Sequence, residues 1–162
     1  MNLLSNKRVY TIKQTEPSEA GPMNQKVHNT VFYILIIDGV PEDHSKLRDI
    51  INKLIPQSYI ESIYSEEEST SYFKNLKVAP SFIILDALTQ STSLRLTIYM
   101  IRQNERLKQV PIVLVNANLN LNQKRELKFL GVNEFYAELS NPMEMRILTN
   151  DIKSRWLLPR VD

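Results

Sequence analysis

Four polar residues of this chain follow short apolar runs, each at a point where a strand is expected to end. They are Asp38, Asp86, Asn116 and Glu138. The carboxyl ends of parallel strands meet at one edge of a sheet, and open α/β folds bind ligands and carry out reactions there. We therefore expect these side chains to lie at one edge. A carboxylate at such an edge, Asp86 above all, could accept a phosphoryl group or hold a divalent cation.

The elements that would position these residues alternate along residues 31–157. Apolar or alternating runs predict strands at 31–37, 58–64, 82–86, 111–115 and 134–137. Helical spacing follows each run, with Ser65 as a candidate N-cap whose box partner is Glu68, and with Gly131 as a C-cap. Five strand–helix repeats predict a parallel sheet covered by helices on both faces.

Composition narrows the class of protein. The length of 162 residues suits one domain, and the absence of cysteine fits the reducing cytoplasm. No apolar run approaches the roughly 18 residues of a membrane span. Residues 1–30 hold four basic and two acidic residues, and the remainder holds 16 of each. A neutral body argues against nucleic acid as a partner, because nucleic-acid binding requires a clustered basic face.

Four segments carry a resemblance to a known family. Residues 34–43 (ILIIDGVPED), 82–86 (FIILD), 110–117 (VPIVLVNA) and 131–139 (GVNEFYAEL) resemble, in order and interval, the receiver domain of two-component response regulators. Residues 102–111 and 156–159 are similar to small stand-alone receivers, including those that serve bacterial phytochromes. The resemblance implies a flavodoxin-like (βα)5 doubly wound sheet of order 2-1-3-4-5 over residues 31–157. Residues 1–30 would form a partly disordered arm, and residues 158–162 a tail.

The resemblance also assigns roles at the sheet edge. Asp86 stands at the phosphoacceptor position, and Asp38 matches the first acid of the pair that holds Mg²⁺ in the family. Gly39 stands where the second acid is expected. Asn116 replaces a hydroxyl residue, but its amide can still donate a hydrogen bond. Glu138 replaces a lysine.

The substitution of Glu138 for lysine has the largest electrostatic consequence. Two like charges about 4 Å apart repel by roughly 4 kcal/mol at an effective dielectric near 20. A phosphoryl group would thus meet added negative charge. Asp38 and Asp86 could hold Mg²⁺ only weakly, so no resident cofactor is expected. The pocket is interpreted as degenerate.

We predict a signalling module that acts through protein–protein contacts and has no enzymatic activity of its own. Its partner would be another signalling protein, such as a histidine kinase. The working surface would be the fourth helix, the fifth strand and the last helix, with Phe135 at the family's aromatic switch position. Trp156 and Leu157 at the end of the last helix either pack back on the body or form a homodimer face.

Three alternatives are open at this stage. A phosphoaccepting receiver would use Asp86 as acceptor, with Asp38 and Glu42 holding Mg²⁺. Asp38, Asp86 and Glu138 could instead form a metal site, since three clustered carboxylates favour a cation or a raised pKa. A nucleotide site at the sheet edge is disfavoured, because the chain has three glycines and no glycine-rich phosphate loop.

Overall fold

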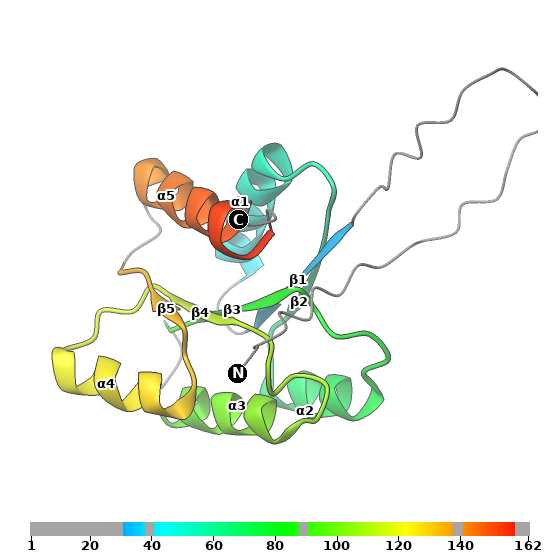
Figure 1. Cartoon of the computed structure of the whole chain (residues 1–162), viewed down its shortest axis with the longest axis vertical. Helices are drawn as coiled ribbons and strands as arrows, with labels where there is room; N and C mark the ends of the chain where they lie inside the picture. Colours follow the sequence, from blue (N-terminus) through cyan, green and yellow to red (C-terminus); the bar gives the residue numbers. More distant parts are fainter. Residues whose placement is uncertain (1–30, 38–40, 88–90, 138–140, 158–162) are drawn as a thin grey trace, which may run out of the picture.

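The computed structural model describes residues 31–37, 41–87, 91–137 and 141–157 (Figure 1). The strands are β1 (Phe32–Ile37), β2 (Ser58–Ile63), β3 (Phe82–Asp86), β4 (Ile112–Val115) and β5 (Glu134–Phe135). The helices are α1 (Pro41–Leu54), α2 (Glu66–Asn75), α3 (Ser91–Gln103), α4 (Leu121–Leu130) and α5 (Pro142–Ile152), and a π-helical turn, η1 (Lys153–Leu157), continues α5. The predicted alternation is confirmed.

All neighbouring strands run parallel, in the order β2-β1-β3-β4-β5. This is the order that the resemblance implied. In the central pairs Ile37 lies beside Leu85, and Asp86 lies beside Val115. The carboxyl ends of β1, β3 and β4 are therefore level with one another, so Asp86 lies on the edge where the sequence predicted it.

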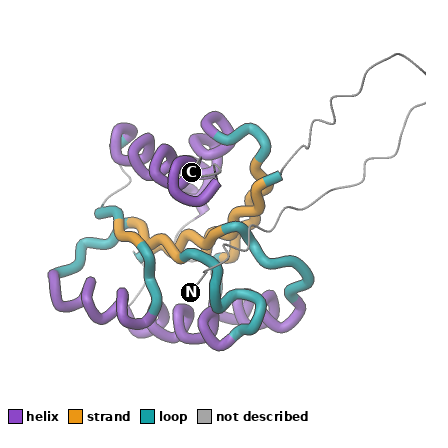
Figure 2. The backbone as a smooth tube through the Cα atoms, viewed as in Figure 1, coloured by secondary structure: helices purple, strands orange, loops and turns teal. Residues whose placement is uncertain are grey.

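Two layers of helices cover the sheet (Figures 1 and 2). Helices α1 and α5 pack on one face, and α2, α3 and α4 pack side by side on the other. Alternate strand residues separate the two cores: Leu35 and Ile83 join the α2–α3–α4 side, and Ile34 and Ile84 join the α1–α5 side. Each central strand is buried on both faces, which explains why its sequence is continuously apolar.

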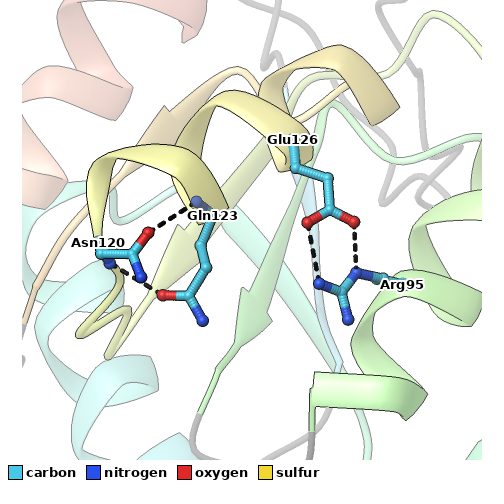
Figure 3. A network of polar contacts seen from close by, with 4 residues as sticks. All are labelled: Arg95, Asn120, Gln123 and Glu126. Atoms are coloured by element: carbon cyan, nitrogen blue, oxygen red, sulfur yellow. Dashed lines mark hydrogen bonds and ion pairs between the residues drawn. The ribbon is translucent and has the colours of Figure 1, made fainter.

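Local sequence signals fix the helix ends. Gly131 ends α4 with a φ of 111°, a left-handed conformation that glycine adopts without strain. Asn141 caps α5 by accepting a hydrogen bond from the Met143 amide. A complete capping box closes the start of α4: the Asn120 side chain accepts from the Gln123 N–H, and the Gln123 side chain accepts from the Asn120 N–H (Figure 3).

Two details differ from the sequence predictions. The Ser65 side chain caps α2 as predicted, but the Glu68 carboxylate accepts from the Tyr64 amide and not from Ser65. Strand β5 has two residues where four were predicted, although the Tyr136 N–H still donates to the Leu114 carbonyl. Phe129 lies on the outer side of α4 and is 92% exposed. No helix in the described segments is both long and apolar enough to span a membrane.

Candidate functional site

The centre of the candidate site is Asp86, the last residue of β3. Its side chain is only 3% exposed, which is unusual for a carboxylate. The Asn116 amide, just beyond β4, donates to both carboxylate oxygens, with Nδ2 3.0 Å from Oδ1 and 3.1 Å from Oδ2. Hydrogen bonds of this kind stabilise a carboxylate that is withdrawn from water. The two residues predicted for neighbouring strand ends thus meet in space.

Backbone conformation aims the Asn116 side chain. Its φ is 53°, the one non-glycine residue with a positive φ among the described segments. Asparagine adopts this left-handed region more readily than most residues, because its short side chain bonds locally. The chain turns sharply here: the Ala117 N–H, one residue on, donates to the Tyr136 carbonyl at 3.0 Å. The loop after β4 is therefore fastened to both β3 and the segment after β5.

Several predicted site residues lie outside the described residues, namely Asp38, Gly39 and Glu138. Glu42 belongs to α1, and Trp156 and Leu157 belong to η1, but their side chains are likewise not described. The predicted gathering at the sheet edge is thus confirmed for Asp86 and Asn116, and stays a prediction for the rest.

The two aromatic residues at the end of the sheet face opposite layers. Phe135 in β5 is half-buried and packs against the core of the α2–α3–α4 side. Tyr136, the next residue, packs against the core of the α1–α5 side. Its hydroxyl donates to Asp151 Oδ2 of α5 at 2.8 Å. Tyr136, and not Phe135, is therefore the aromatic residue that joins the sheet edge to α5.

Electrostatics hold this junction together. Burial, and then the hydrogen bond to the Asp151 carboxylate, raise the pKa of the Tyr136 hydroxyl above its ordinary value. The hydroxyl therefore stays neutral and donates at physiological pH. A second contact lies nearby, where Arg155 Nη1 is 2.5 Å from Glu134 Oε1. No sequence pattern indicates either contact, because each joins residues of two different elements.

A half-buried cation, Arg102, lies at the end of the sheet opposite to Asp86. Arg102, at the end of α3, donates to the carbonyls of Val110 (2.9 Å) and Gly131 (2.5 Å), with longer contacts to Leu107 and Lys108. Burial lowers the pKa of its guanidinium. These carbonyls belong to the ends of the α3–β4 loop and of α4, where unpaired acceptors need donors. Arg102 is thus a structural residue.

Three polar side chains, from β1, β2 and α2, lie in contact with one another. The Tyr33 hydroxyl of β1 contacts both the Glu61 carboxylate of β2 and the Tyr72 hydroxyl of α2. Burial raises the pKa of the Glu61 carboxyl, and it raises the pKa of Tyr72 to about 12. The group joins β1, β2 and α2 near the amino end of β1, remote from Asp86.

Metal chemistry requires more ligands than the described residues supply. Mg²⁺ takes hard oxygen ligands, usually one or two carboxylates together with waters. Asp86 provides one carboxylate, and the described segments contain no group of three or more His, Cys, Asp or Glu side chains placed to hold a metal ion together. A cation at Asp86 would draw its second carboxylate from Asp38, whose position is not described.

Comparisons with known proteins agree on the fold. The sequence matches no family model and no curated protein. Among solved structures, the phosphorylated cyanobacterial phytochrome response regulator RcpA is similar, with a TM-score of 0.68, 16% identity and coverage of 79% of this chain and 95% of its own. A receiver domain of a histidine kinase from Clostridium thermocellum has a TM-score of 0.68, 20% identity and coverages of 78% and 98%.

A third similar structure contains a bound metal ion. The receiver domain of a sensor histidine kinase from Pseudomonas aeruginosa, with a magnesium ion coordinated in the active site cleft, has a TM-score of 0.61 and 16% identity, covering 78% of this chain and 98% of its own. At these identities the likeness establishes the fold alone. The chain therefore has the flavodoxin-like fold of response regulator receiver domains, and its chemistry must be argued from its own residues.

Proposed function

We propose that this chain is a receiver-like signalling module that binds a partner protein and does not depend on an aspartyl phosphate. The observation that carries the proposal is the Asp86–Asn116 pair. Both oxygens of the acceptor-position carboxylate accept hydrogen bonds from one neutral amide. Phosphorylation of one Asp86 oxygen would weaken the hydrogen bond that this oxygen accepts, so the contact favours the unmodified carboxylate.

The sequence around the pair supports the same proposal. A phosphoryl group on a carboxylate carries negative charge that must be balanced by cations and donors. Gly39 provides no metal ligand, and Glu138 brings an anion where a lysine would bring a cation. The site therefore lacks two of the charges that would stabilise the phosphorylated state.

The partner-binding surface would lie on α4, β5 and α5. Tyr136 and Asp151 join α5 to the loop after β4, which contacts Asp86. A conformational change at Asp86 would therefore alter the partner-binding surface, and partner binding would alter the surroundings of Asp86. The partner would be another signalling protein, such as a histidine kinase. Phe135 would report the state of the surface by moving between more and less buried positions.

One observation favours a second function, that of a phosphoacceptor at Asp86. The Asn116 amide is a hydrogen-bond donor already positioned 3.0 Å from the carboxylate, and such a donor could also stabilise a phosphoryl oxygen. Asp38 and Glu42 would then hold Mg²⁺ beside Asp86. This function requires the chain to tolerate Glu138 near the phosphoryl group.

Beryllofluoride with Mg²⁺, a mimic of a phosphoryl group, separates the two functions. We expect no saturable shifts of the Asp86, Asn116 and Ala117 amides in NMR spectra of the wild-type chain. The double variant Gly39→Asp, Glu138→Lys restores the missing charges and should respond. Saturable shifts in the wild-type chain that vanish in Asp86→Asn would contradict the proposal. An unresponsive double variant would show that the missing charges are not the cause.

Homodimerisation through the end of the last helix is the alternative to packing of that end back on the body. Trp156 and Leu157 supply the apolar surface for it. Sedimentation of the full chain against a chain that ends before Trp156 provides the test. An unchanged mass would argue against a dimer through that end.

A further inference from the structure

The outward face of α3 carries an apolar stripe that none of the described residues covers. Leu96 and Tyr99 are 44% and 57% exposed, and Gln103 continues their line. Spacings of three and four residues place all three side chains on one face of the helix. The opposite face, with Ile98 and Ile101, is fully buried. Helix α3 lies between α2 and α4, so the stripe runs along the middle of the whole layer (Figures 1 and 2).

Opposite charges flank this stripe. On one side, α4 exposes Arg125 and Lys128, and neither forms an ion pair with any described residue. The acid of α4, Glu126, is already bound to Arg95 of α3 at 2.8 Å (Figure 3). On the other side, α2 begins with three successive glutamates, of which Glu67 and Glu68 are exposed. The three-helix face is therefore basic along α4, apolar in the middle and acidic at the first turn of α2, whose last turn carries the exposed Lys74.

The charged residues of α2 and of α4 lie at the same level along the helix axes. Asn104, just after α3, donates to the Phe73 carbonyl of α2, and Arg102 donates to the Gly131 carbonyl at the end of α4. These contacts bring the carboxyl ends of the three helices level. Glu67 precedes Phe73 by six residues, and Arg125 precedes Gly131 by six. Both charges thus lie about 9 Å back along their helices, since each residue rises about 1.5 Å.

We propose that this face is a homodimer interface with a two-fold axis that runs along α3. Rotation about that axis places α3 on its own copy, so that Leu96 and Tyr99 are covered by the same residues of the second copy. The rotation also exchanges the two borders, and α4 then faces α2 of the second copy. Arg125 meets Glu67 twice by symmetry, as an isologous interface requires. An axis across the helices would bring like charges together, so charge selects the first arrangement.

The size of the face sets the expected affinity. Three helices about 10 Å apart and 15–20 Å long give a footprint of roughly 500 Å² per copy. The total buried surface, about 1,000 Å², lies at the lower limit for a specific interface. The dimer should therefore be weak and concentration-dependent, and it should dissociate further at high salt because exposed charges are screened.

Reversing the charge of one border residue at a time, in the full-length chain, tests the direction of the two-fold axis. Sedimentation equilibrium should show reversible dimerisation of the wild-type chain. Arg125→Glu and Glu67→Lys should each weaken it about tenfold, because each variant faces like charges at both borders of its own dimer. An equimolar mixture of the two variants should restore dimerisation, since every border contact is then between opposite charges. Arg146→Glu, on α5 in the other helix layer, is the matched control and should leave dimerisation unchanged.

Three results would overturn the proposal: a wild-type chain that is monomeric at all accessible concentrations, a mixture that associates no better than its components, or dimerisation that persists in Leu96→Ser, Tyr99→Ser. Circular dichroism of each variant verifies that the fold is retained. A chain that ends before Trp156 should still dimerise through α3. Loss of the dimer in that truncation would assign it to the end of the last helix instead.

Discussion

Asp86 and Arg102 are both charged side chains withdrawn from water, and both are bound by neutral groups. They lie at opposite ends of the sheet. Asp86 is bound by a side-chain amide on a loop, and Arg102 by backbone carbonyls of the α3–β4 loop and of Gly131 at the end of α4. A single side-chain amide can turn away and expose its carboxylate to a ligand. Four carbonyls of two different segments cannot all move away from Arg102 without disrupting the fold. Asp86 therefore belongs to a site that can change conformation. Arg102 and the carbonyls that it binds, here called the clamp, form a contact that cannot.

The largest expected effect concerns the clamp. A Cβ at Gly131, whose φ is 111°, would overlap Arg102 Nε. We expect Gly131→Ala to lower the free energy of unfolding by about 3 kcal/mol, from steric overlap and backbone strain together. Urea denaturation measures this change. In an Arg102→Ala background the overlap is gone, and the cost should fall to that of backbone strain alone. Equal costs in both backgrounds would show that the clamp and the turn are independent.

A smaller loss in the free energy of unfolding is expected when the Asp86–Asn116 contact at the sheet edge is removed. Asn116→Ala removes the amide from Asp86 and places alanine in a left-handed conformation, for a loss of about 2 kcal/mol in the free energy of unfolding. Asn116→Gly removes the amide without the backbone strain and should cost less. If the two variants were equally stable, backbone strain would play no part. If Asn116→Gly matched the wild-type chain, the Asp86–Asn116 contact would contribute nothing to stability.

The link from the edge to α5 should contribute less still. Tyr136→Phe removes the hydroxyl that donates to Asp151 and should cost about 1 kcal/mol at neutral pH. The folded chain raises the pKa of this hydroxyl, so the stabilisation is complete below the unfolded value near 10 and is lost as the pH rises above it. Tyr72, with a pKa raised to about 12, adds to the same loss between pH 10 and 12.

Chemical denaturation at a series of alkaline pH values tests this link. The wild-type chain should lose stability steeply above pH 10, and Tyr136→Phe should lose it less steeply. Tyr99→Phe, at an exposed hydroxyl on α3, is the matched control. Identical slopes for the wild-type chain and Tyr136→Phe would contradict a buried, neutral hydroxyl at this position.

The smallest effect is expected at the exposed pair between α3 and α4. Arg95 and Glu126 form a two-pronged contact, at 2.8 and 2.9 Å, that raises the pKa of the arginine and lowers that of the glutamate. Surface pairs of this kind contribute little, because water and salt screen them. Arg95→Ala should therefore shift the melting temperature only slightly, and the shift should vanish at high salt. A shift that persists at high salt would mean that Arg95 acts through packing instead.

Local patterns in the sequence were sufficient to predict the framework. Continuous apolar runs located β1, β3 and β4 because those strands are buried on both faces, and Gly131 marked the end of α4 through its capping chemistry. The strand order followed from the resemblance to receiver domains. Asp86 and Asn116 were predicted to meet because both follow strands whose carboxyl ends share an edge.

Other features depend on contacts between distant parts of the chain, which no local pattern encodes. The Tyr136–Asp151 hydrogen bond joins β5 to α5, and Arg102 reaches four carbonyls of two different segments. Phe129 resembles a core residue by its type, but its position on α4 turns it outward. The segregation of charge across α2 and α4 is hidden in a sequence whose overall charge is nearly balanced.

The central claim is that Asp86 occupies the acceptor position without accepting phosphate. Intact-mass spectrometry after incubation with Mg²⁺ and a small-molecule phosphoryl donor tests it most directly. The wild-type chain should show no added phosphoryl group, and Gly39→Asp, Asn116→Thr, Glu138→Lys should gain one that Asp86→Asn abolishes. A single phosphoryl group on the wild-type chain, mapped to Asp86 and absent from Asp86→Asn, would contradict the account.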